Sequence, residues 1–105
     1  MMNEEAKAWL HEQFGDDDET IRLVWTEYVT SFGEKLAEAN AAQATGDYPL
    51  LDKVAHALKG NALMVGDAPS VTAALALRDA AKASDGERAA KALARLAELE
   101  KEARA

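Results

Sequence analysis

The chain has 105 residues, which is enough for one domain with a hydrophobic core of its own. Its formal net charge of −7 disfavours binding to nucleic acid or to an anionic membrane surface, and the absence of cysteine excludes disulfides and thiolate chemistry. No apolar run is long enough to span a bilayer and the acidic start lacks the features of a signal peptide, so we expect one cytoplasmic domain over residues 1–105.

Alanine, leucine, glutamate and lysine dominate the sequence, only two prolines occur, and no strand-like alternation of apolar and polar residues persists. These features predict an all-α protein. The first expected helix is short and covers about residues 4–14. Its apolar side consists of Trp9, Leu10 and Phe14.

The acidic run at residues 16–19 ends this helix. Either Asp17 or Asp18 can cap the next helix, and the run lacks the ligand spacing of a calcium-binding loop. The second helix is long, covering about residues 19–44, and its apolar residues recur at three- and four-residue spacing. They are Ile21, Val24, Trp25, Tyr28, Val29, Phe32 and Leu36.

Three further helices follow. Asp47 is the expected cap of the third helix, with Pro49 in its first turn and Gly66 as a left-handed stop. The fourth covers about residues 68–83, and residues 84–87 ("SDGE") have the spacing of a capping box that opens the fifth. Because the loops are short, neighbouring helices should be antiparallel. We therefore expect an up-and-down four-helix bundle with a short additional N-terminal helix.

The third helix has one apolar face and one exposed strip. At roughly 100° per residue, its core face consists of Leu51, Val54, Ala55, Leu58, Ala62 and Val65. His56 points away from this face, and Lys59, Gly60 and Leu63 lie beside it. A glycine here costs about 1 kcal/mol of helix stability against alanine. In return, it leaves the imidazole accessible to a large partner.

This strip suits one kind of chemistry. Imidazole is a nucleophile near neutral pH, and the ammonium group of Lys59 could neutralise a transferring anion, most obviously a phosphoryl group. No second base and no phosphate-binding loop accompany His56. The residues therefore favour a phosphoryl carrier and not an enzyme that uses ATP. His11 is expected to be a surface side chain, and two distant histidines predict no metal site.

The segment "AHALKGNALMVG" (residues 55–66) resembles the signature of the histidine-containing phosphotransfer (HPt) domain family. The agreement lies at His56, at residues 58–60, at Ala62 and at Gly66. The segments "FGDDDETIRLVWTEYVTSF", "GDYPLLDKVAH" and "LRDAAK" also resemble the family, so the similarity covers nearly the whole chain.

The resemblance implies a helical bundle that relays phosphoryl groups between receiver-domain aspartates in two-component signalling. It makes His56 the phospho-accepting residue, with Lys59 assisting the phosphoryl group and Gly60 leaving room for the receiver. Leu63, an exposed apolar neighbour, is a candidate partner contact or a lateral packing residue. The implied partners are response-regulator receivers and a hybrid or sensor histidine kinase. The chain itself would be a monomer without a cofactor, since magnesium belongs to the receiver.

The sequence departs from the family pattern at a few positions. Arg78 stands where the family often has glutamate, and Leu63 and Met64 stand where small or polar residues are common; both departures bear on which receiver fits. Two alternatives remain open. One is a helical interaction module that binds a receiver or kinase without being phosphorylated. The other is the dimerisation hairpin of a kinase, although nothing in the chain resembles the ATP-binding domain of such a kinase.

Overall fold

Five α-helices account for almost the whole chain in the computed structural model, which describes residues 1–105. They are α1 (Glu4–Phe14), α2 (Asp18–Thr45), α3 (Tyr48–Met64), α4 (Ala68–Lys82) and α5 (Gly86–Arg104). There is no strand, and the boundaries expected from the sequence agree with these to within a few residues. The predicted all-α class is confirmed.

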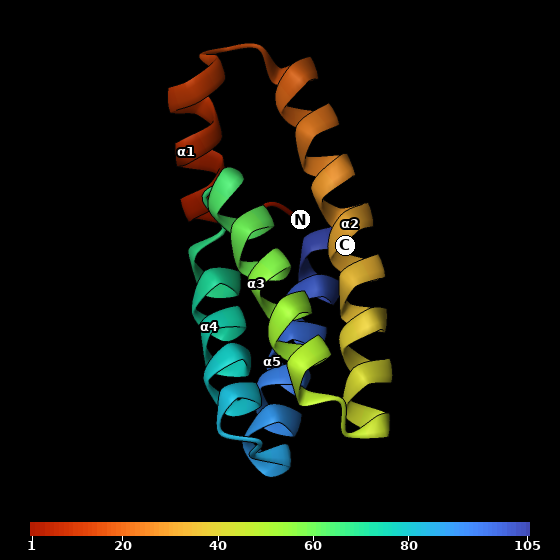
Figure 1. The fold of residues 1–105 in the computed structure, drawn as a ribbon. Helices are drawn as coiled ribbons and strands as arrows, with labels where there is room; N and C mark the ends of the chain where they lie inside the picture. The colour runs from red at the N-terminus through yellow and green to blue at the C-terminus, as the bar shows by residue number, and fades with distance from the viewer.

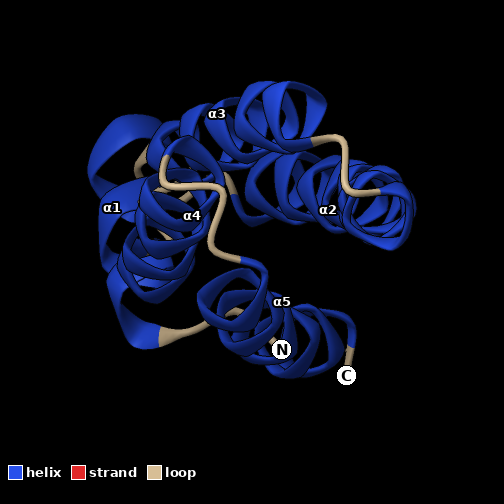
Figure 2. Ribbon diagram, turned by 60° about the horizontal axis from the view of Figure 1, so that its bottom comes forward, coloured by secondary structure: helices blue, strands red, loops and turns tan.

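Helices α2 to α5 form an elongated bundle that measures 44 × 19 × 18 Å together with α1 (Figure 1). Around the bundle, α3 packs between α2 and α4, and α5 closes the ring between α4 and α2. Figure 2 shows the consequence: α3 and α5 lie diagonally across the bundle from each other. Helix α1 stands beside one end of the bundle. The predicted four-helix bundle with a short N-terminal addition is confirmed.

An aspartate or asparagine starts every helix. In each case the side chain accepts a hydrogen bond from the backbone N–H three residues later, which satisfies a donor that has no partner within the helix. The five caps are Asn3, Asp17, Asp47, Asp67 and Asp85. The cap of the second helix is thus Asp17 and not Asp18, and Asp47 is confirmed.

The predicted capping box at the start of α5 is wrong. Asp85, not Ser84, is the cap, and it accepts a 3.1 Å hydrogen bond from the backbone N–H of Arg88. Ser84 has a positive φ of 51°, because it lies in the turn that leaves α4. A cap residue needs a non-helical backbone, and all five caps combine a negative φ with a positive ψ. Asp85 has this conformation, whereas the positive φ of Ser84 excludes it.

The turn between α3 and α4 also holds α1 in place. Gly66 has a φ of 69°, which confirms the predicted left-handed stop, although α3 itself ends two residues earlier. A Cβ atom on Gly66 would overlap the side chain of Trp9 on α1. The glycine is therefore required twice, once by its backbone conformation and once by the close approach of Trp9.

The core is built mainly from alanine and leucine, with three aromatic residues from α2. All six residues predicted for the core face of α3 are buried. On α2, Val24 and Val29 are only half-buried, while the other five predicted residues are buried. On α1 the prediction is partly wrong: Ala6 and Leu10 form the buried face, and Phe14 is 41% exposed because the short helix packs along one edge only. None of the five helices combines the length and the apolar character needed to cross a membrane.

Candidate functional site

The packing of α3 fixes the direction of His56. Its neighbours Ala55 and Leu58 are 0% and 4% exposed, because they face the core. The 3.6-residue repeat of the helix then turns His56 outward, and its side chain is exposed. The imidazole makes no hydrogen bond with another group of the chain. Both ring nitrogens are therefore free to react with, or hydrogen-bond to, a visiting partner.

The other residues predicted for this site lie on the same strip of α3. Lys59 is half-buried and forms no ion pair, so its ammonium group has no carboxylate partner. At Gly60, nothing lies within 4 Å of the position that a Cβ atom would occupy. Leu63 is 53% exposed. The helix thus brings together an exposed imidazole, an ammonium group without a carboxylate partner, open space at Gly60 and an exposed apolar side chain.

An ion pair that the sequence analysis missed borders this strip. Arg78 of α4 donates from Nε to Asp52 Oδ1 of α3 at 3.1 Å. Asp52 precedes His56 by four residues, so the pair lies one helical turn from the imidazole. Arg78, a departure from the family pattern, therefore pairs with a carboxylate beside this strip. The pairing depends on the register of α3 against α4, which no single-helix pattern contains.

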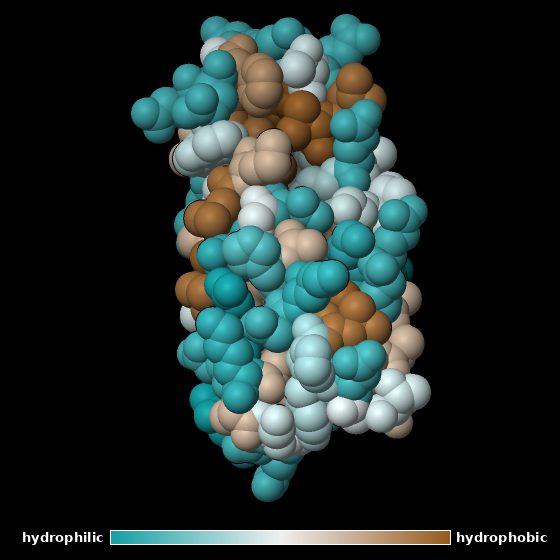
Figure 3. Space-filling view, in the orientation of Figure 1, coloured by the Kyte–Doolittle hydropathy of each residue, from teal (hydrophilic) through white to brown (hydrophobic).

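An apolar hollow of about 580 Å³ opens between α1, α2 and the C-terminal end of α3. Figure 3 shows brown, hydrophobic atoms between the upper parts of α1 and α2. The hollow is lined by Trp9, Gln13, Phe14, Val24, Glu27, Tyr28, Ser31, Asn61, Met64 and Val65. At its edge Met64 is 71% exposed, and Asn61 Nδ2 donates a 3.0 Å hydrogen bond to Ser31 Oγ. Because three helices contribute to it, the sequence pattern gave no sign of this hollow.

The second histidine belongs to a helix end. His11 Nδ1 donates a 3.0 Å hydrogen bond to the carbonyl oxygen of Gly15, which is the first residue after α1 and its C-cap. Its Nε2 atom lies 3.9 Å from Asp18 Oδ1. No group of three or more histidine, cysteine, aspartate or glutamate side chains is arranged to hold a metal ion.

Comparison with known proteins gives one result that covers most of the chain. The Hpt domain family matches residues 23–105, which include all but the first residues of α2 and the whole of α3, α4 and α5. No curated protein and no solved structure matches the chain. The matched region contains the exposed strip of α3. The chain therefore belongs to the Hpt family, whose domains carry out histidine phosphotransfer in phosphorelays.

Proposed function

We propose that this protein is a phosphoryl carrier of a two-component phosphorelay, in which His56 accepts the phosphoryl group of a receiver-domain aspartate and passes it to another receiver. The observation that supports this most directly is the exposed, unpaired imidazole of His56 on the outer face of α3. The family match implies the same chemistry. A sensor or hybrid histidine kinase would supply the phosphoryl group at the start of the relay.

The transfer needs one nucleophile and one cation from this chain. In its neutral form the imidazole of His56 attacks the phosphorus of the aspartyl phosphate with the Nε2 lone pair. A P–N bond forms as the bond from phosphorus to the aspartate oxygen breaks, and the carboxylate leaves with the electron pair. The ammonium group of Lys59 then stabilises the charge on the moving phosphoryl oxygens. The same steps in reverse pass the group to a second receiver, and the magnesium ion belongs to that receiver.

The surface around His56 suits a receiver. Gly60 leaves open space one turn after the imidazole, so a large partner can approach it. Leu63 and Met64 are exposed near this space, and Met64 also lines the apolar hollow that lies between α3, α1 and α2. Burial of such a patch stabilises a complex by about 25 cal/mol for each Å² of apolar surface removed from water, before the cost of association. We propose that the receiver covers this patch.

The experiment is phosphotransfer from receivers that have been phosphorylated with acetyl phosphate in the presence of magnesium. Every receiver of the source organism is tested against the wild-type protein, against His56→Gln and against the matched control His11→Gln. We expect acid-labile, alkali-stable phosphate on the wild type and on the control, and none on His56→Gln, with equal helical circular dichroism for all three. A receiver that binds without any transfer would instead identify an unphosphorylated interaction module.

A further inference from the structure

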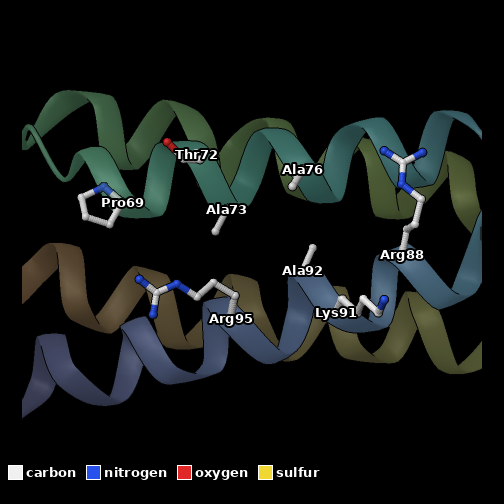
Figure 4. Close-up of a pocket in the computed structure, with 8 residues that line it drawn as sticks. All are labelled: Pro69, Thr72, Ala73, Ala76, Arg88, Lys91, Ala92 and Arg95. Carbon is white, nitrogen blue, oxygen red and sulfur yellow. The ribbon is translucent and has the colours of Figure 1, made fainter.

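A second surface, separate from the exposed strip of α3, lies between α4 and α5. It is a groove of about 520 Å³, to which each helix contributes four residues at i, i+3, i+4 and i+7 (Figure 4). The α4 wall contains nothing larger than Pro69 and Thr72, and the floor is formed by Ala73 and Ala92, both 6% exposed. The groove exists because these side chains are too small to fill the space between the helices.

The groove is positively charged in an otherwise acidic protein. Arg88, Lys91 and Arg95 of α5 line it, whereas none of the 19 acidic residues of the chain does. Arg88 and Lys91 form no ion pair. Arg95 pairs with Glu98 at 3.3 Å, but both side chains are more than half exposed, so this pair is weak. Three cations therefore face a common space with little internal compensation.

The spacing of the three cations suits an acidic helix as the ligand better than it suits one small anion. Arg88 and Arg95 are seven residues apart, which places their Cα atoms about 10 Å apart along the axis. Figure 4 shows the two arginines at opposite ends of the groove, with Lys91 between them. One phosphate or carboxylate reaches only one of these positions. A helix with acidic residues at i, i+3 or i+4, and i+7 presents a carboxylate to each, and small residues let its backbone approach closely.

We propose that the α4–α5 groove is a docking site for an acidic amphipathic helix of a partner protein. A short acidic helix fits within the groove and interacts mainly with its three cations, because charges more than about 8 Å away are largely screened at physiological ionic strength. A nucleic acid or an anionic membrane extends beyond the groove to the rest of a protein with a net charge of −7, which disfavours both. Helix α5 lies diagonally across the bundle from α3 (Figure 2), so the cations are on the other side of the bundle from His56. The docked helix would leave His56 free, and a partner held in this way could stay bound during phosphotransfer.

The test uses a fluorescein-labelled helical peptide of 14 residues, in which glutamates recur at i, i+3 and i+7 among alanine and leucine. A peptide of the same composition in scrambled order is the first control. Fluorescence anisotropy should show binding of the patterned peptide at low salt that weakens as sodium chloride is raised. Equal binding of both peptides, or no binding of either, overturns the proposal.

A pair of triple variants tests whether the peptide binds in the groove. The triple variant Arg88→Gln/Lys91→Gln/Arg95→Gln should weaken peptide binding by about tenfold to a hundredfold. The matched triple variant Lys7→Gln/Arg22→Gln/Lys101→Gln removes the same charge from exposed residues outside the groove, and it should bind almost as well as the wild type. If the two triple variants lose the same affinity, the peptide responds to net charge and the groove is not its site.

A neutral substitution tests the shape of the groove independently of its charge. Ala76 is an exposed residue of the groove, so Ala76→Leu should fill it, keep all three cations and weaken peptide binding. The control is Ala90→Leu, at an exposed position of α5 outside the groove. Phosphorylation of His56 by phosphoramidate should be unchanged in all these variants. Preferential binding to vesicles that contain phosphatidylglycerol, in place of the peptide, would identify a membrane as the partner and reject the proposal.

Discussion

The hydroxyl of Tyr28 donates a 2.7 Å hydrogen bond to Oδ2 of Asp67, and the two residues are only 6% and 2% exposed. Asp67 also accepts hydrogen bonds from Ser70 Oγ at 2.7 Å and from Asn3 Nδ2 at 2.8 Å. No cation is paired with this buried carboxylate. Neutral donors from α2, α4 and the segment before α1 therefore satisfy it. This network joins the turn between α3 and α4 to the N-terminal helix, next to the apolar hollow.

The first prediction concerns this hydrogen bond. Tyr28→Phe should lower the free energy of unfolding by about 1 to 3 kcal/mol, because a buried acceptor loses its partner. The matched control is Tyr48→Phe, since the hydroxyl of Tyr48 makes no hydrogen bond within the chain and the residue is half-buried. Its effect should stay within about 0.5 kcal/mol. Urea denaturation followed by circular dichroism measures both, and equal losses would contradict the role given to Asp67.

The second prediction is a loss of stability at alkaline pH. Burial of the Tyr28 hydroxyl, reinforced by the neighbouring Asp67, raises the pKa of Tyr28 well above its ordinary value of 10.0. Above pH 10 the side chain of Tyr28 loses its phenolic proton in the unfolded chain, while it retains this proton in the folded chain. The free energy of unfolding should therefore fall with pH, with a slope from this group that approaches about 1.4 kcal/mol per pH unit. Tyr28→Phe should remove this contribution, and identical pH profiles of variant and wild type would refute the assignment.

The third prediction compares two glycines with nearly the same positive φ. Gly46 and Gly66 have φ values of 68° and 69°, so alanine is strained at either position, by about 1 to 2 kcal/mol. At Gly46 a Cβ atom meets open space, whereas at Gly66 it overlaps Trp9. Gly66→Ala should therefore destabilise the protein by about 1 to 3 kcal/mol more than Gly46→Ala does. Thermal unfolding gives the difference, and similar melting temperatures would show that α1 can shift without cost.

Features that depend on one helix could be predicted from the sequence. The core face of α3 and the outward direction of His56 follow from the 3.6-residue period alone, because the side chains concerned lie on consecutive turns. The choice between Ser84 and Asp85 as a cap could not be predicted, because it depends on how the chain leaves α4.

Features that join distant segments could not be predicted either. Tyr28 and Asp67 are 39 residues apart in the sequence, and nothing local marks them as partners. The apolar hollow likewise forms only when α1, α2 and α3 pack in a particular register, and the α4–α5 groove depends in the same way on the packing of two helices. The resemblance to the Hpt family implied a helical bundle and roles for His56, Lys59 and Gly60, but not these contacts.

The fourth prediction tests the role of Lys59. In a helix the Cα–Cβ bonds tilt towards the N-terminus, so Lys59 leans back over the turn that carries His56, whereas Lys53 leans away from it. Lys59→Ala should raise the barrier to phosphotransfer by about 2 to 4 kcal/mol, as expected for loss of a well-aimed charge, with little change in receiver affinity. Lys53→Ala, on the same helix, should change the rate much less. Rapid-quench kinetics measure both rates, and equal rates for Lys59→Ala and the wild type would exclude the role.

The fifth prediction separates access to His56 from its chemistry. A Cβ atom at Gly60 would have no other atom within 4 Å. Gly60→Ala and Gly60→Leu should therefore fold and be more stable than the wild type by up to about 1 kcal/mol, because both residues favour helix more than glycine does. The leucine would stand between the imidazole and a docked receiver, and the methyl group of alanine would intrude less. Transfer from a phosphorylated receiver should therefore fall slightly in Gly60→Ala and strongly in Gly60→Leu. Phosphoramidate is small enough to reach His56 in both variants, and it should phosphorylate them at the wild-type rate. Unchanged transfer from the receiver to Gly60→Leu would show that the partner does not use this notch, whereas a loss with both donors would show that leucine had disturbed the imidazole itself.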